Sequence, residues 1–182
     1  IRQQLLPGSV TRYAGYTCWR GITENNGRVD EYTSSEYWAT QGRFGMAPMK
    51  NGLIYWFACI NTTARNPQFQ KLTAPEIGDI FAHLPKVVHN IITTTSLERI
   101  LHHDLSDIKP LRQFVFGRVV LLGDAAHATT PNMGQGAGQA IEDAIVLGNG
   151  FKQFEHVDKV LAFYEEKRVA RTAKVIRLSR QI

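Results

Sequence analysis

Polar and apolar residues alternate along the first part of the chain as β-strands require. Val10 to Thr23 and Val29 to Thr40 are rich in Tyr, Thr and Trp, and a short polar turn separates them. Phe44 to Met49 and Leu53 to Asn61 form a second pair, joined through Asn51-Gly52. Aromatic and β-branched residues favour strands, and Asn-Gly favours a tight hairpin turn. The pattern predicts an antiparallel sheet.

The following residues change to the period of helices. Thr73 to Glu76 has the spacing of a capping box, which predicts a helix from there through Leu84. Pro85 to Ile92 indicates a second short helix, and Leu97 to Leu105 a strand that returns to the sheet. Near the C-terminal end, Val157 to Ser179 predicts a long helix. Its expected inner face comprises Val157, Val160, Leu161 and Tyr164.

Between these regions lies a short apolar run that ends in a glycine and a carboxylate. Val119 to Leu122 is typical of a strand buried on both faces in an α/β sheet, and Gly123 ends it. The side chain of Asp124 would emerge where the strand stops. Because ligands of open α/β folds bind at the carboxyl ends of the strands, this position indicates a binding site.

A glycine-rich segment and a new helix follow. Pro131 and Asn132 keep the chain out of helix, and the glycines at 134, 136 and 138 allow the backbone to approach a ligand closely. The new helix carries a narrow stripe of small or apolar residues, which we expect to lie against a sheet. The stripe comprises Ala137, Ala140, Ile141, Ala144, Ile145 and Gly148.

The start of this helix favours negative charge, because its first N–H groups have no partner within the helix. A phosphate would satisfy them, but the nearby Asp124 carboxylate would repel it. A better ligand has hydroxyl groups at one end, which donate to Asp124, and becomes anionic at the other. A flavin has both ends, namely a ribityl chain and a ring whose pyrimidine side is negative when reduced.

The run GRVVLLGDAAHATTPNMGQGAGQAIEDA, Gly117 to Ala144, closely resembles the second flavin motif of the FAD-dependent aromatic hydroxylases, the single-component group typified by para-hydroxybenzoate hydroxylase. Three other segments are similar to that family and occur in the expected order. They are YAGYTCWRG at Tyr13 to Gly21, GRFGMAPMKNGLIYWF at Gly42 to Phe57, and YEEKRVAR at Tyr164 to Arg171. The resemblance covers nearly the whole chain.

The resemblance implies a role for each residue of the motif. Asp124 would hydrogen-bond the ribityl chain, Gly123 would permit close approach, and Pro131 would wall one side of the ring. Backbone N–H groups around Gly136 and Ala137 would face its pyrimidine edge. The expected cofactor-binding set is Gly123, Asp124, Pro131, Gly134, Gly136 and Ala137.

Other polar residues of the motif have a plainer interpretation. Glu142 and Asp143 are as consistent with solvated helix positions as with a functional role. His127 is more typical of a packed, hydrogen-bonded histidine than of an acid or base. No catalytic acid or base can be named.

The family's activity is hydroxylation or epoxidation of an aromatic or other electron-rich small molecule. NADPH or NADH reduces the FAD, O2 adds to the reduced ring, and the resulting hydroperoxide transfers one oxygen atom, so the cofactor carries the hard chemistry. The expected substrate contacts are Arg43, Met46, Pro48 and Tyr55. Two alternatives stay open: an FAD-dependent reductase or oxidase on the same scaffold, and a noncatalytic half-protein that serves as an interaction module.

The chain contains no GxGxxG turn, which dinucleotide-binding folds use for the pyrophosphate. We therefore expect a C-terminal half that lacks most adenosine contacts and is inactive alone, with the missing N-terminal half as its partner. The uncovered surface would favour self-association. The expected fold is mixed α/β, with the end of an upstream cofactor segment at 1–7, a substrate-binding β-sheet at 8–95 and the C-terminal part of a Rossmann-like FAD-binding domain at 96–182.

Composition narrows the remaining classes. The hydrophobic fraction of 43% is ample for a core. The net charge of +5 comes largely from a C-terminal helix, and because that helix also carries acidic residues, it does not indicate a nucleic-acid site. Cys18 and Cys59 lack a paired spacing and suggest reduced core thiols. No metal-ligand motif, signal peptide or transmembrane run occurs, and we expect a cytoplasmic protein.

Overall fold

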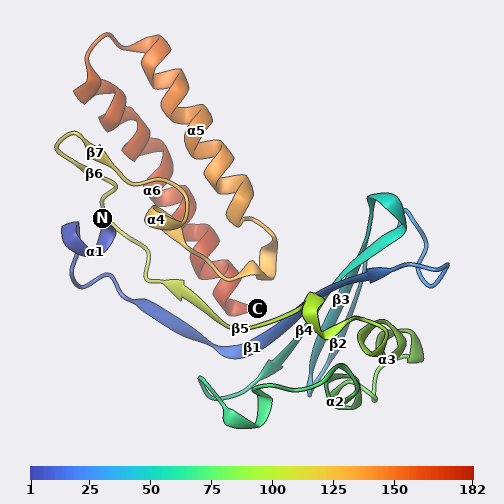
Figure 1. Ribbon diagram of the computed structural model, residues 1–182. Coiled ribbons are helices and arrows are strands. Elements are labelled where there is room, and N and C mark those ends of the chain that lie inside the picture. Colours follow the sequence, from blue (N-terminus) through green and yellow to red (C-terminus); the bar gives the residue numbers. More distant parts are fainter. The chain divides into compact units, whose positions relative to one another are not determined.

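A computed structural model describes residues 1–182, which divide into two compact units (Figure 1). One unit comprises Ile1–Ala14 and Ser106–Ile182, and the other comprises Gly15–Leu105. Strands β1 (Thr11–Glu24) and β5 (Ile100–Ile108) each have residues in both units. The expected region 8–95 differs from the second unit at its end, because β5 belongs to the same sheet as the strands before it.

The unit Gly15–Leu105 is built on a five-stranded sheet of order β2-β3-β4-β1-β5. Strands β2 (Ser35–Ala39), β3 (Gly42–Met49) and β4 (Leu53–Asn61) form antiparallel pairs with their neighbours, and β4 also pairs with β1. The predicted antiparallel sheet is confirmed.

The predicted strand Val29 to Thr40 is too long, and it does not pair with the strand before it. Residues ahead of Ser35 form a loop, in which Asn25 donates to the carbonyl of Val29 and accepts from its N–H. Asn26 and Gly27 adopt positive φ angles of 47° and 73°. This loop carries the chain to the far edge of the sheet, so β2 pairs with β3 alone.

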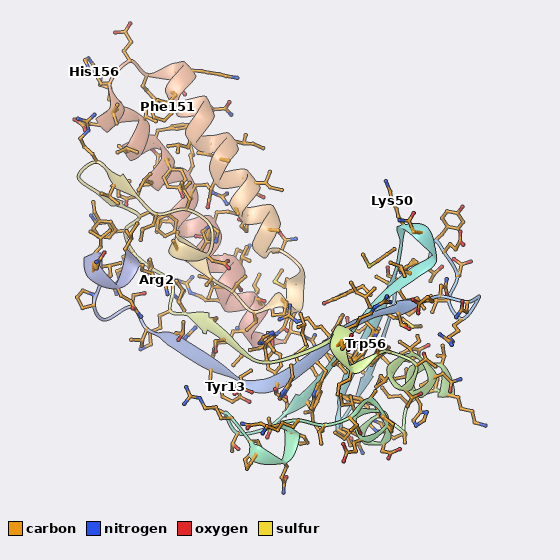
Figure 2. The ribbon with its side chains drawn as sticks, viewed as in Figure 1. Arg2, Tyr13, Lys50, Trp56, Phe151 and His156 are labelled. Carbon is orange, nitrogen blue, oxygen red and sulfur yellow. The ribbon has the colours of Figure 1, made fainter.

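The hairpin between β3 and β4 forms at the predicted dipeptide. A 3₁₀ turn, Lys50–Gly52, joins the strands, and Asn51 and Gly52 have φ angles of 62° and 66°. Asn and Gly tolerate this left-handed conformation better than other residues, which is why the turn forms here. Lys50 marks the tip of the hairpin in Figure 2.

Two short helices, α2 (Ala74–Ile80) and α3 (Lys86–Thr93), cover one face of this sheet (Figure 1). The capping box of Thr73 and Glu76 is present as predicted, although α2 ends before Leu84. Trp56, labelled in Figure 2, is fully buried there and donates from Nε1 to Thr95 Oγ1 at 2.9 Å. Apolar side chains fill the space between helices and sheet, including Trp19, Phe44, Ile54, Ile77, Phe81 and Ile91.

The other unit is dominated by two long helices, α5 (Gly136–Gln153) and α6 (Val157–Gln181), which lie side by side (Figure 1). Phe151 and His156, labelled in Figure 2, mark the end where they are joined. Short helices α1 (Arg2–Leu5) and α4 (Asp124–His127) complete the helical part. No helix has both the length and the apolar character needed to cross a bilayer.

The predicted buried strand Val119 to Leu122 is wrong in length and in partner. Strand β7 (Val119–Val120) pairs only with β6 (Val115–Phe116), in an antiparallel hairpin, and Val119 is 42% exposed. The chain provides no parallel strand beside it, so the apolar run cannot be covered on both faces.

The predicted contact of α5 with a sheet is likewise not made. Ile141 and Ile145 on the predicted stripe are 62% and 57% exposed. The face that α5 buries against α6 instead carries Gln139 and Asp143. Polar and apolar residues therefore share this buried face, since Val146 and Leu147 also pack into the cluster that contains Tyr164, while the apolar stripe stays uncovered.

Three segments of the helical unit meet at one buried carboxylate. Asp107, at the end of β5, accepts two hydrogen bonds of 2.8 Å from Arg12 and one of 2.8 Å from Arg180 at the end of α6. Its side chain is completely buried, whereas the two arginines are about one-third exposed or less. Charge-assisted bonds of this kind fix the two strands and the helix end together.

Candidate cofactor and substrate sites

Gly123 and Asp124 form a tight turn at the start of α4, three residues after β7 ends at Val120. Gly123 adopts φ 53° and ψ −139°, which residues with a side chain rarely reach. An added Cβ would lie 3.4 Å from the Cβ of Ala140, so α5 passes close to the turn. Asp124 begins α4 and is exposed.

A buried carboxylate holds this turn in place. Asp143 of α5 accepts from the Gly123 N–H at 2.8 Å and from His127 Nε2 at 2.5 Å through one oxygen, and from Arg168 Nε at 2.7 Å through the other. Burial alone would raise the pKa of Asp143, but the hydrogen bonds from His127, Gly123 and Arg168 outweigh it and lower that pKa. Asp143 is therefore an anion inside the helix pair.

Arg168 supplies the compensating charge and is itself 3% exposed. Besides Asp143, its guanidinium donates to Glu142 Oε2 at 2.5 Å and to the carbonyl and Oε1 of Gln139 at 3.0 and 2.8 Å. The planar guanidinium suits several acceptors at once. We call His127, Gln139, Glu142, Asp143 and Arg168 the Asp143 network.

The sequence did not identify the Asp143 network. From the sequence, Asp143 is as consistent with a solvated position as with a functional role, and nothing there pairs it with Arg168. The signal available was the spacing of Gln139 and Asp143, four residues apart, which places both on one helix face. His127 is buried and hydrogen-bonded, as a packed histidine would be.

The start of α5 is open to a ligand. Gly134 takes the left-handed conformation with φ 62°, and no side chain caps the helix at Gln135. A Cβ on Gly136 would meet nothing closer than Thr129 Cγ2 at 3.8 Å, and one on Gly138 would meet nothing within 4 Å. Thr129 Oγ1 is buried without a hydrogen-bond partner. The helix start thus offers uncapped N–H groups beside an unsatisfied hydroxyl.

The segment before α5 is anchored to α6. Pro131 begins a 3₁₀ turn, Pro131–Met133, and is exposed. On either side, Thr130 and Asn132 donate to the carbonyl of Ser179 at 3.0 and 2.7 Å. The polypeptide around the predicted cofactor residues is therefore held rigidly, while Asp124, Pro131 and the helix start remain accessible. These features fit a ligand with hydroxyl donors and an anionic edge.

The four predicted substrate contacts do not share one face of the sheet. Arg43 lies opposite Cys59, and Tyr55 lies opposite Ala47, so both side chains stand on the face away from α2 and α3. Met46 is opposite Trp56 and is 7% exposed within the core on the helix side. Pro48, two residues on, shares that side. Because side chains alternate along a strand, we correct the expectation and keep only Arg43 and Tyr55 as candidates.

Arg43 is surrounded by aromatic rings on this open face of the sheet. Its guanidinium carbon lies 5.2 Å from the ring centre of Trp38, 5.7 Å from Phe57 and 5.9 Å from Tyr16. A single carboxylate, Glu36, lies 3.3 Å away. The guanidinium donates to this carboxylate and also interacts with Cys59, while the rings stack on it.

Tyr55 and Arg20 extend the same face. Burial raises the pKa of Tyr55, although the charge of Arg20 opposes the rise, so the phenol stays protonated as a donor. The Nε of Arg20 is buried and has no hydrogen-bond partner. Buried donors normally find a partner, so this face retains unsatisfied hydrogen-bonding capacity.

A family model described as an FAD binding domain matches residues 17–179, which is most of the chain. The chain belongs to this FAD binding domain family.

Members with similar sequences and structures extend the comparison. Aurachin C monooxygenase/isomerase of Stigmatella aurantiaca is 38% identical over 94% of this chain and 44% of its own length. An FAD-dependent urate hydroxylase of Klebsiella pneumoniae is 33% identical over 93% of this chain and 44% of its own length. The crystal structure of Klebsiella pneumoniae HpxO with FAD and uric acid has a TM-score of 0.92 and 30% identity, covering 99% of this chain and 47% of that one. The chain spans about half the length of these FAD binding domain proteins.

Proposed function

We propose that this chain supplies the ribityl, ring and substrate contacts of an FAD-dependent monooxygenase, which hydroxylates or epoxidises an aromatic or other electron-rich small molecule. The observation that carries the proposal is the Gly123–Asp124 turn, fixed by Asp143 with the Asp124 side chain exposed, in a member of the FAD binding domain family. NADPH or NADH is the reductant and O2 the oxidant.

The residues around the turn hold the cofactor. Asp124 accepts hydrogen bonds from the ribityl hydroxyls, and Pro131 and Gly134 border the ring. The N–H groups of Gly136 and Ala137 at the uncapped start of α5 stabilise negative charge on its pyrimidine edge. When bound and reduced, the flavin would activate O2, of which one oxygen atom would enter the product and the other would leave as water.

Arg43 and Tyr55 select the substrate. A guanidinium and a protonated phenol both donate hydrogen bonds, so they bind a molecule that carries carbonyl or anionic oxygens. The surrounding rings of Tyr16, Trp38 and Phe57 provide apolar contact for a planar ring. The uric acid in the HpxO structure, an oxygen-rich planar molecule, supports this substrate class.

The apolar stripe of α5 is the docking surface for the N-terminal half. Its exposed members Ile141 and Ile145 lie between small residues, which permit close packing of another element. The relatives carry about as many further residues as this chain contains, which supports an occupant from the same protein. Left uncovered, a stripe of this kind favours self-association.

We expect the 182-residue chain alone to bind FAD weakly. No GxGxxG turn is present for the pyrophosphate, and each 1.4 kcal/mol of lost contact weakens binding about tenfold. Titration of the purified chain, followed by flavin fluorescence, measures the affinity, and sedimentation measures self-association. Stoichiometric submicromolar binding by a monomer would contradict the proposed need for a second half.

Asp124→Ala should weaken flavin binding by about tenfold to a hundredfold in a protein that carries both cofactor segments. Hydrogen bonds to a charged group contribute about 1.5–3 kcal/mol, which corresponds to that range. Asp158→Ala is the matched control, because it removes the same charge from an exposed position at the start of α6. Equal affinities for Asp124→Ala and the unmodified protein would remove Asp124 from the site.

A further inference from the structure

We propose that Cys18 and Cys59 are a peroxide-reactive thiol pair that closes a cross-strand disulfide on the sheet face that carries Arg43. The two thiols are free, and 2% and 4% of their residue surfaces are exposed. The sequence separates them by about forty residues and gave no reason to pair them. The sheet brings them together.

The register of the sheet places the two cysteines directly opposite each other. Cys18 of β1 pairs with Cys59 of β4 in antiparallel strands, so both side chains stand on the same face. Opposite residues in such strands have Cα atoms about 4.5–5.5 Å apart, inside the range of about 4.4–6.8 Å that a disulfide spans. The Cys18 thiol donates to the carbonyl of Trp19 at 3.3 Å, and it lies close enough to Cys59 for each thiol to shift the pKa of the other. Little backbone movement is needed to join them.

Arg43 completes a row across three strands. It lies opposite Cys59 on the side of β3, so Cys18, Cys59 and Arg43 occupy adjacent positions on β1, β4 and β3. The neighbouring Cys18 thiol, followed by the charge and hydrogen bond of Arg43, lowers the pKa of Cys59 despite its burial. Contact with Cys59, together with burial, raises the pKa of Cys18. Cys59 is therefore the more acidic thiol and the first nucleophile, and Cys18 is the second thiol.

The two roles define a balanced oxidation by hydrogen peroxide. The Cys59 thiolate attacks one peroxide oxygen, the O–O bond breaks, and hydroxide leaves and takes the Cys18 proton to form water. The Cys18 thiolate then attacks the Cys59 sulfenic sulfur, the S–O bond breaks, and the departing hydroxide takes a proton from solvent. Two thiols and one peroxide give a disulfide and two waters, with the sulfurs oxidised by two electrons and the peroxide reduced by two.

Closure of the disulfide alters Arg43. The guanidinium loses its hydrogen bond with the Cys59 thiol on β4 and retains Glu36 on β2. Under the proposed function Arg43 is a substrate contact, so oxidation changes substrate affinity. The thiol chemistry itself does not depend on that function, and it can be tested with neither flavin nor substrate present.

Treatment of the folded chain with hydrogen peroxide, followed by alkylation and intact mass measurement, tests the proposal. We expect a loss of two hydrogens and a Cys18–Cys59 cross-linked peptide after digestion, both reversed by dithiothreitol. Cys18→Ala should instead stop at a sulfenic acid on Cys59 that dimedone traps, whereas Cys59→Ala should react several-fold more slowly at Cys18. Unmodified thiols, or sulfinic acid without a cross-link in the unsubstituted chain, would overturn the proposal even if neither variant folds.

The variant Arg43→Gln tests whether the charge of Arg43, and not only its place in the sheet, activates Cys59. Without the guanidinium the pKa of Cys59 rises, so disulfide formation should slow several-fold at pH 7 and recover as the pH approaches the ordinary cysteine value of about 8.5. Arg99→Gln is the control, because Arg99 is exposed and pairs with Glu24. A rate at pH 7 that Arg43→Gln leaves unchanged would refute the activation of Cys59 by Arg43.

Discussion

Replacing Arg168 with alanine should lower the free energy of unfolding by about 3–5 kcal/mol, the cost of leaving one charge of a buried pair without its partner. Asp143 would remain completely buried, with hydrogen bonds from His127 and Gly123 only. Gln139 and Glu142 would lose their bonds to the guanidinium as well. Urea unfolding followed by far-ultraviolet circular dichroism measures the change.

Arg171→Ala is the matched control for this experiment. Arg171 lies on the same helix and contacts the same Glu142 at 3.4 Å, but its side chain is 52% exposed. Exposed ion pairs contribute about 0.2–1 kcal/mol, so this variant should unfold almost as the unsubstituted chain does. Equal losses for the two variants would show that burial of the Asp143 network does not govern its contribution.

At acid pH, the free energies of unfolding of Arg168→Ala and of the unsubstituted chain should differ less than at neutral pH. The pKa of Asp143 is lowered in the folded state, so its stabilising contribution is complete above the unfolded value of about 3.9. That contribution is lost as the pH falls through the lower folded value. The gap between the two proteins should therefore be constant near neutral pH and shrink below about pH 4.

Trp56→Ala should destabilise the sheet unit by about 3–5 kcal/mol, as expected when a large aromatic side chain is removed from a core. Trp56 is fully buried, stacks on Phe44 with ring centres 5.9 Å apart, and donates to Thr95. A cavity would remain, whereas the Thr95 hydroxyl would keep the hydrogen bond that it donates to the carbonyl of Ile91 at 2.7 Å. The midpoint and slope of urea unfolding give the loss.

Trp38→Ala is the matched control, because it removes an indole from the same sheet at a position where the tryptophan is 62% exposed. Its stacking with the Arg43 guanidinium at 5.2 Å is worth about 0.5–1 kcal/mol at an exposed site. We expect a small loss for this variant. A loss as large as that of Trp56→Ala would contradict the assignment of the core to the face covered by α2 and α3.

The features predicted correctly from the sequence are those set by neighbouring residues. Asn51-Gly52 specifies a hairpin because both residues accept a left-handed backbone, and Thr73 caps a helix through a residue three positions away. Strand β2 was predicted too long because the residues from Val29 to Ser34 belong to a loop, in which Val29 bonds to the Asn25 side chain instead of to a neighbouring strand. The apolar run at Val119 and the stripe on α5 were predicted to be buried because the sequence cannot show whether the covering element is present.

In the candidate sites, too, only the features set by neighbouring residues could be predicted. The position of Asp124 after a glycine and the open start of α5 could be predicted from motif and spacing. The Asp143 network could not, because it joins residues 25 positions apart on two helices through hydrogen bonds that periodicity does not record. Met46 cannot share a sheet face with Arg43, because residues three positions apart on a strand face opposite ways.

The bonds of Asp143 have a consequence for how this region tolerates mutation. The Asp143 carboxylate accepts hydrogen bonds from the Gly123 N–H, the His127 ring and the Arg168 guanidinium. Replacing Asp143 or Arg168 alone therefore removes a hydrogen-bond partner from the other. An acceptable replacement must change positions 143 and 168 together and still provide an acceptor for the turn. A change at either position alone therefore leaves a buried polar group without its partner, even though neither side chain reaches the surface.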